Sequence, residues 1–116
     1  MLPKLAPTED KFFCSSPRGD LVVFDTLGNE LYNLGRGTME SWDQSGKNII
    51  YAITEETEFD IVSAELHVAH LGDSLTIQSL AVPRIAACDP EFSPTGRKVL
   101  FTDCHSWEIY VSELGN

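Results

Sequence analysis

The chain has 116 residues, 42% of them hydrophobic and 22% charged, which is enough for one domain with a buried core and is not typical of a disordered protein. Its 8 lysines and arginines stand against 18 aspartates and glutamates, a formal net charge of -10. This balance excludes nucleic acid and an anionic membrane surface as expected partners, because both would be repelled. No apolar run reaches the roughly 18 residues of a membrane span.

Three segments of the chain share one pattern, so the predicted elements repeat. The copies lie at 5–14, 42–52 and 92–102. The second copy follows the first by 37 residues, and the third follows the second by 50; Gly46 matches Gly96, and an apolar run follows in each copy. These spacings lie on either side of the roughly 40–50 residues of one four-stranded propeller blade. We therefore expect three consecutive blades.

Apolar runs rich in β-branched and aromatic residues predict the strands, and helical periodicity is nowhere sustained. In chain order the expected strands are 4–6, 11–16, 20–26 and 30–34; 39–42, 48–53, 59–66 and, after an insertion, about 75–82; then 89–92, 97–102 and 108–113. The sequence thus predicts an all-β chain of about three four-stranded antiparallel blades, the last incomplete. We expect one β-propeller segment over 1–116, with repeats at about 1–37, 38–86 and 87–116.

The turn motif Phe92-Ser-Pro-Thr-Gly-Arg-Lys98 resembles the Ser-Pro-Asp-Gly-Lys blade motif of TolB-like β-propellers, which are WD-repeat-like. The same repeat occurs in the propeller domains of prolyl oligopeptidase and dipeptidyl peptidase relatives. Glu108-Ile-Tyr-Val111 is similar to the family's third strand, whereas Thr95 stands where the family has Asp. The motif has a structural role: Pro fixes its φ, Gly accepts a positive φ, and the aromatic (Trp42, Phe92) can pack between blades.

The resemblance implies a non-catalytic scaffold without a cofactor, which presents loops and a central channel to a protein or peptide. The acidic charge predicts a basic partner. Two alternatives stay open. The chain is the propeller portion of a serine peptidase of the prolyl oligopeptidase type, whose hydrolase domain lies outside these residues, or it is a partial propeller that assembles with copies of itself. Three blades do not close a ring, so either a longer propeller or a homo-oligomer would complete it.

The insertion at about 67–74 carries two groups of candidate residues. Leu71-Gly-Asp-Ser-Leu75 matches the nucleophile block of the GDSL esterases, but Asp103-Cys-His105 is one residue short of their Asp-x-x-His, so we expect only a turn. His67, His70 and Asp73 are the second group. Their spacing does not demand a metal, and we expect no metal site; because loops on rigid scaffolds commonly bind partners, we predict contact residues here.

The hairpin loops of the second and third repeats supply the remaining predicted contacts. Glu55 and Glu56 belong to an acidic loop that lacks the spacing of a calcium loop. Trp107 lies at a loop tip; we expect it to pack on the neighbouring blade, and the alternative is an exposed binding residue. The predicted binding residues are therefore His67, His70, Asp73, Glu55, Glu56 and Trp107.

The cysteines and the first residues predict the compartment. Cys14, Cys88 and Cys104 are odd in number and have no CxxC spacing, so we expect reduced thiols. Cys14 aligns with Tyr51 and is expected to fill a core position. Segment 1–10 has no apolar stretch of signal-peptide length. Together these features predict a cytoplasmic location, with the periplasm or secretion as alternatives if the chain is a piece of a longer protein.

Overall fold

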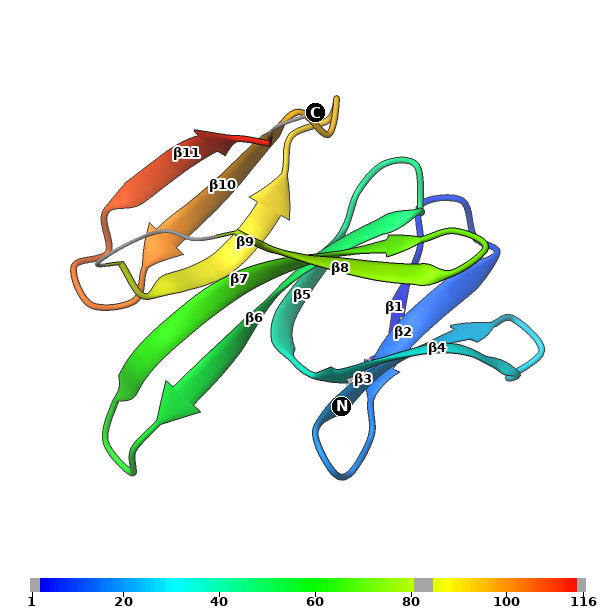
Figure 1. Ribbon diagram of the computed structural model, residues 1–116, viewed down its shortest axis with the longest axis horizontal. Coiled ribbons are helices and arrows are strands. Elements are labelled where there is room, and N and C mark those ends of the chain that lie inside the picture. Colours follow the sequence, from blue (N-terminus) through cyan, green and yellow to red (C-terminus); the bar gives the residue numbers. More distant parts are fainter. Residues whose placement is uncertain (1–2, 81–84, 115–116) are drawn as a thin grey trace.

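The computed structural model describes residues 3–80 and 85–114, and they form three antiparallel sheets without a helix (Figure 1). Blade 1 consists of β1 (Lys4–Leu5), β2 (Lys11–Ser15), β3 (Asp20–Asp25) and β4 (Glu30–Arg36), paired in that order. Blade 2 consists of β5 (Thr38–Trp42), β6 (Asn48–Glu56), β7 (Ile61–Leu71) and β8 (Leu75–Leu80). Blade 3 consists of β9 (Ala87–Phe92), β10 (Lys98–Asp103) and β11 (Ile109–Glu113).

The predicted all-β architecture of a partial β-propeller is confirmed, and each expected strand is present. The expected end of the eighth strand, 81–82, lies outside the described residues. No helix that could cross a membrane occurs in the described part of the chain.

Two strands are longer than the sequence predicted. β7 continues to Leu71, so the expected insertion at 67–74 is wrong for its first part: the ladder pairs Tyr51 with His67 and Asn48 with His70. β6 likewise continues to Glu56 and pairs Glu55 with Ser63, so the two glutamates lie on a strand end rather than in a loop. In both places backbone pairing overrides the polar side chains that indicated a loop.

The three turn motifs take equivalent places in the three blades. Glu9 N donates to Ala6 O at 2.9 Å, Gly46 N to Asp43 O at 3.2 Å, and Gly96 N to Ser93 O at 2.8 Å. Glu9, Gly46 and Gly96 all have positive φ, at 62°, 70° and 74°. The predicted spacings of 37 and 50 residues are therefore those of the structure, and Glu9 adopts at a cost the conformation that glycine accepts freely.

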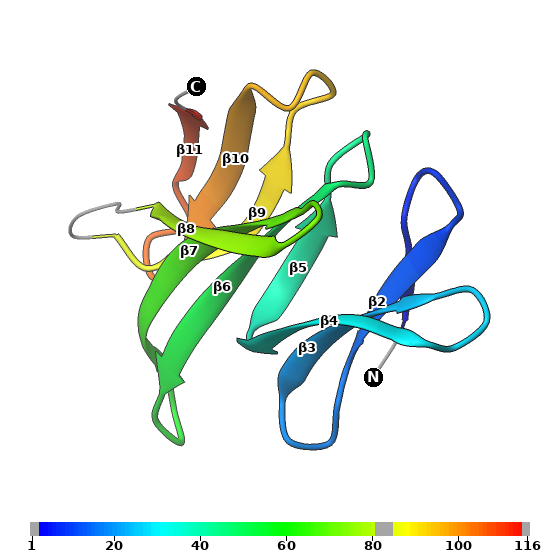
Figure 2. The ribbon, with the colours of Figure 1, turned by 45° about the vertical axis from the view of Figure 1, so that its right-hand side comes forward.

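Blade 2 lies between blades 1 and 3 (Figure 2) and is buried on both faces. Phe13 in blade 1, Ile50 in blade 2 and Leu100 in blade 3 are equivalent in the repeat. We call the face of each blade that carries this residue its forward face, and we call the opposite face its reverse face. The forward face of blade 1 packs on the reverse face of blade 2, in the cluster Phe13, Leu21, Val23, Leu34, Ile49, Tyr51, Ala69 and Leu71. The forward face of blade 2 packs in the same way on blade 3, in the cluster Ile50, Ala52, Leu66, Ala87, Val99 and Phe101.

The motif aromatics pack between blades, as predicted. The Trp42 ring stacks on Phe13 with centroids 5.1 Å apart, and Phe92 packs against the cluster between blades 2 and 3. Cys14 does not follow the prediction. It is only half-buried and lies on the reverse face of blade 1, outside both clusters, because no preceding blade covers that face among the described residues.

Candidate functional site

The hairpin loops between the second and third strands of the three blades lie at equivalent ends of their sheets. They comprise residues 16–19, 57–60 and 104–108, and we call this end the loop side. The first seam is the contact between blades 1 and 2, and the second seam is the contact between blades 2 and 3. The two seams differ at the loop side: the first opens into a cleft, whereas the second is bridged.

The cleft of the first seam has a volume of about 840 Å³. The residues that line it are Ser15, Ser16, Pro17, Gly19, Arg36, Gly37, Thr38, Ala52, Ile53, Thr54, Glu55 and Glu56. Gly37 joins β4 to β5 at the back of the cleft, where a Cβ atom would lie 2.7 Å from Tyr51 Cδ2. Only glycine fits there without displacing that buried ring. Burial also raises the pKa of Tyr51 above its ordinary value.

The cleft carries polar groups that have no partner in the described residues. Ser15 Oγ is buried and accepts or donates no hydrogen bond there. Glu55 and Glu56 are exposed, and within residues 3–80 and 85–114 neither carboxylate forms an ion pair. The Arg36 guanidinium, the one cation of the lining residues, is directed to the backbone instead, donating to Thr54 O at 2.9 Å. The cleft is therefore lined by two glutamates whose carboxylates form no ion pair there, and a ligand that carries positive charge would supply the missing partner.

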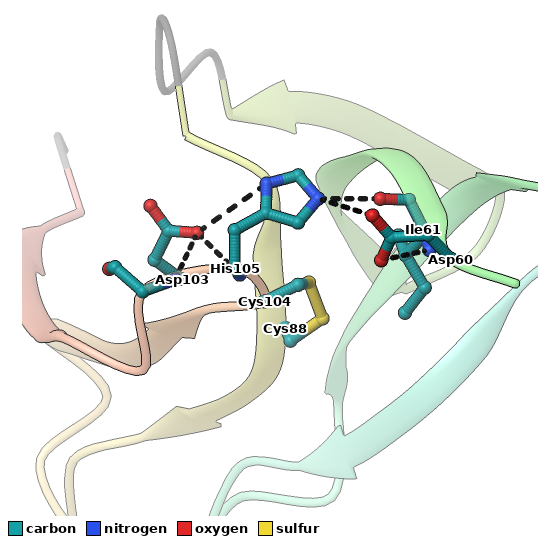
Figure 3. Close-up of a disulfide and its surroundings, with 7 residues drawn as sticks. Asp60, Ile61, Cys88, Asp103, Cys104 and His105 are labelled. Atoms are coloured by element: carbon teal, nitrogen blue, oxygen red, sulfur yellow. Dashed lines mark hydrogen bonds and ion pairs between the residues drawn. A yellow bond between two sulfur atoms is a disulfide. The ribbon is translucent and has the colours of Figure 1, made fainter.

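The second seam is closed at the loop side by the loop that follows β10 (Figure 3). His105 Nε2 donates a hydrogen bond to Ile61 O, at the start of β7, at 2.6 Å, and it lies 3.8 Å from Oδ2 of Asp60 in the preceding hairpin loop. The same ring has Nδ1 4.0 Å from Asp103 Oδ1. This histidine therefore links blade 3 to the hairpin of blade 2.

A disulfide bond between Cys88 and Cys104 holds the bridging loop to β9 (Figure 3). The two Cα atoms are 5.4 Å apart, and Cys104 N also donates to Ala86 O at 2.8 Å. The prediction of reduced thiols is therefore wrong for these two cysteines. Their 16-residue separation carried no motif, and the antiparallel pairing of β9 with β10 brings them together. Cys14 is free.

Trp107 and Phe59 project from the loop side. Trp107 is 75% exposed and has a positive φ of 65°, so the expected packing on a neighbouring blade is wrong. Phe59, in the hairpin of blade 2, is 91% exposed. Phe59 is not among the binding residues predicted from the sequence, although an aromatic residue within an acidic turn was a usable signal. The loop side thus combines exposed aromatic rings with carboxylates.

The predicted contacts of the insertion do not form one surface. His67 and His70 are three residues apart on β7 and therefore point to opposite faces of the sheet. His67 stacks on Tyr51 with centroids 5.7 Å apart, whereas His70 Nδ1 lies 2.7 Å from Asn48 Oδ1. Asp73 lies in the β7–β8 turn. In the described ranges, no three His, Cys, Asp or Glu side chains lie close enough together to hold a metal ion.

The GDSL segment forms a turn, as expected. Ser74 follows the end of β7, whereas His105 contacts Ile61 at the beginning of that strand. At about 3.3 Å per residue an 11-residue strand is more than 30 Å long. A histidine at the far end cannot accept a proton from Ser74, since general-base catalysis needs direct hydrogen-bond contact.

A second hollow, of about 220 Å³, lies where the first strands of the three blades meet. Lys4 joins β1 to β5: its Nζ donates to Glu40 O at 3.2 Å, and its backbone oxygen accepts a hydrogen bond from Trp42 Nε1 at 3.1 Å. Met39 and Asp89, which are equivalent in the repeat, have positive φ of 53° and 50° at irregular pairings of β5 and β9. Such bulges re-aim side chains, and here both residues line the hollow. These bulges were not predicted from the sequence.

Comparison of the sequence with protein-family models and with curated proteins gave no match. Among solved structures, the chain is similar to the β-propeller domain of Cps50 (Swd1) from Myceliophteria thermophila, with 12% sequence identity and a TM-score of 0.46. The match covers 98% of this chain and 53% of that domain, so the chain spans about half the length of the propeller it matches.

Proposed function

We propose that the chain is a non-catalytic β-propeller scaffold that binds a basic segment of another protein at the loop side, in the cleft of the first seam. The observation that carries this proposal is the pair of carboxylates at Glu55 and Glu56, which lack a cationic partner beside the buried, unpartnered hydroxyl of Ser15. A lysine or arginine side chain would supply the missing charge and hydrogen-bond donors. The TolB-like type of blade, inferred from the turn motif, is part of the same proposal.

The surroundings of the cleft support an extended basic segment rather than a compact small molecule. The cleft lies at the surface between two hairpin loops, and its lining includes the backbone at both ends of the β4–β5 connection. Phe59 and Trp107, farther along the loop side, are exposed aromatic rings that can receive apolar or cationic side chains of the same segment. The net charge of -10 would speed the encounter with a basic partner.

A short lysine-rich peptide with a fluorescent label tests the proposal by anisotropy. We expect the full chain to bind it, and affinity to fall as salt is raised because the attraction is electrostatic. The paired substitution Glu55→Gln/Glu56→Gln should weaken binding about tenfold or more, since loss of about 1.4 kcal/mol corresponds to tenfold.

A matched control separates the cleft from the overall charge. Glu30→Gln/Glu58→Gln removes two exposed carboxylates outside the cleft lining, one of them in the hairpin next to Glu56. We expect it to change affinity by less than twofold. Equal losses in the two paired variants, or equal binding of a glutamate-rich peptide, would contradict a site in the cleft. The contact roles of His67, His70 and Asp73 remain predictions.

The non-catalytic part of the proposal rests on the separation of Ser74 from His105. An ester-hydrolysis assay on the chain should give the same background rate for the unchanged protein and for Ser74→Ala. A rate that is lost on this substitution would contradict it. The peptidase alternative places its chemistry in a domain outside these residues and predicts the same background rate here.

The disulfide bond, rather than the thiols expected from the sequence, indicates the cellular compartment in which the protein works. Bonds such as that between Cys88 and Cys104 persist in oxidising compartments, so we propose that the chain works in one, and the cytoplasmic prediction loses one of its two premises. Thiol labelling of the protein from its natural source tests this. One reactive thiol after unfolding, at Cys14, is expected, whereas three would support the cytoplasm.

A further inference from the structure

The three-blade array ends in the forward face of blade 3 and the reverse face of blade 1. These two faces are equivalent in the repeat to the faces that pack together inside the array. In blade 1 the forward face carries Phe13, Leu21 and Val23, all 0% exposed. The equivalent positions in blade 2 are Ile50, at 0%, Leu66, at 1%, and Val68, which packs on the same cluster. In blade 3 the equivalents are Leu100, Ile109 and Val111, which are 44%, 70% and 63% exposed.

The equivalence follows from strand register rather than from residue type alone. Phe13 pairs with Val23, Ile50 with Val68, and Leu100 with Val111. Two residues further along each ladder, at the next position on the same face, Ser15 pairs with Leu21, Ala52 with Leu66, and Thr102 with Ile109. The same apolar triad is thus built three times; it is covered twice and left open in blade 3.

The opposite end of the array presents the complementary face. The reverse face of blade 1 carries Phe12, Cys14, Val22 and Phe24, and none of them belongs to an inter-blade cluster. Phe12 and Phe24 stack with centroids 5.4 Å apart. The equivalent positions in blades 2 and 3 include Tyr51 and Phe101, which receive the forward face of the preceding blade. The chain therefore carries both halves of a contact that it already forms twice within itself.

We propose that two copies of this chain associate head to tail, with the forward face of blade 3 on the reverse face of blade 1 of the second copy, and close a ring of six blades. The blade number selects two copies. Propellers contain four to eight blades, so two copies of three fall within this range and three copies exceed it. Both contacts of such a ring are identical, as a twofold axis requires. This assembly goes beyond the proposed peptide binding, and its test does not use the peptide.

Solution mass is the first test, measured by light scattering on the full chain. We expect twice the chain's 12.9 kDa. Because each copy carries a net charge of -10, added salt should strengthen this assembly, whereas it weakens binding of a basic peptide. A monomer at every concentration would overturn the proposal and favour a following segment of a longer protein as the occupant of the open face.

Surface variants locate the contact. Val111→Glu changes an exposed side chain, so the blade should still fold, and the dimer dissociation constant should rise at least tenfold. Ile77→Glu is the matched control: Ile77 is 45% exposed on β8 of the middle blade, away from both end faces, and its variant should remain dimeric. An equal loss of dimer in both variants would contradict the assigned face.

Crosslinking tests the register. Val111 is equivalent to Val23, which shares a cluster with Tyr51, and Tyr51 is equivalent to Cys14. In Val111→Cys, the new thiol should therefore lie beside Cys14 of the second copy, and oxidation should give a covalent dimer with two bonds. Ile77→Cys should give none. A ladder of larger species would show an open chain of copies and contradict the closed ring.

Discussion

The first and second seams pair the same kinds of faces, yet they end differently at the loop side. In the first seam Gly37 and the half-buried Ser15 leave a cleft of about 840 Å³. In the second, His105 reaches Ile61 O at 2.6 Å and the Cys88–Cys104 disulfide holds its loop in place. The apolar clusters thus align the blades, and the few residues at the hairpin ends decide whether a seam opens or is closed. Four groups of substitutions test this contrast.

Removal of the disulfide should have the largest effect on stability. Cys88→Ala/Cys104→Ala loses a crosslink between residues separated by 16, which should lower the free energy of unfolding by about 3 kcal/mol because the unfolded chain gains freedom. Urea unfolding measures this loss. Cys14→Ala, at the free cysteine, should cost less than about 1 kcal/mol. Equal midpoints with and without reductant would show that the second seam does not depend on the crosslink.

Gly37→Ala tests the first seam. The added Cβ would lie 2.7 Å from Tyr51 Cδ2, and displacement of this buried ring should cost about 2 kcal/mol in unfolding free energy. Because burial raises the pKa of Tyr51, the variant should also bring that pKa back toward its ordinary value, as measured by ultraviolet titration.

Gly72→Ala is the control for this substitution. Its Cβ would lie 3.6 Å from the His70 ring, an ordinary contact, so the change should stay within about 0.5 kcal/mol.

The raised pKa of Tyr51 also predicts a pH dependence of the free energy of unfolding. The protonated ring contributes stability in full below the unfolded pKa of about 10, and this contribution is lost as pH rises toward the folded pKa. A flat profile in alkaline solution would contradict burial of the hydroxyl.

Gly46 and Gly96 lie in turns at the ends of blades 2 and 3 opposite the loop side, and their substitution compares the two seams at these ends. Gly46→Ala and Gly96→Ala both place a side chain at positive φ, which should cost about 1 kcal/mol each. At Gly46 the new Cβ would also lie 2.6 Å from Thr8 Oγ1 of blade 1, whereas at Gly96 the nearest atom, Asp43 Oδ2, is 4.0 Å away. Gly46→Ala should therefore cost about 1 kcal/mol more. In a double-mutant cycle, Thr8→Ala should remove that excess, and an unchanged excess would place the cost elsewhere.

His105→Ala should have the smallest effect. It removes one hydrogen bond to Ile61 O at a half-exposed site, so the loss should be about 1 kcal/mol. Thermal unfolding measures it, and His105→Gln, which keeps an N–H donor, should restore part of the stability. If both variants match the unchanged protein, the histidine does not close the second seam.

The sequence predicted the blades because their signals are local. Turn glycines at 46 and 96 and the apolar runs after them need no knowledge of the rest of the chain. The wrong predictions concern residues whose position or exposure depends on strand pairing or on contacts between blades. His70 reads as a loop residue but lies on a strand, Cys88 and Cys104 meet only when β9 pairs with β10, and Trp107 remains exposed because nothing among the described residues covers it. The cleft could not be predicted at all, because it exists only between two blades.

The backbone amide resonances, followed while a lysine-rich peptide is added, test most directly whether the open seam is the binding seam. We expect the amides of Ser15, Thr38 and Glu55 in the first seam to shift most, and those of Ile61 and His105, near the exposed rings of Phe59 and Trp107, to shift less. Shifts confined to the second seam, or spread evenly over the acidic surface, would contradict a binding site built by the opening between blades 1 and 2.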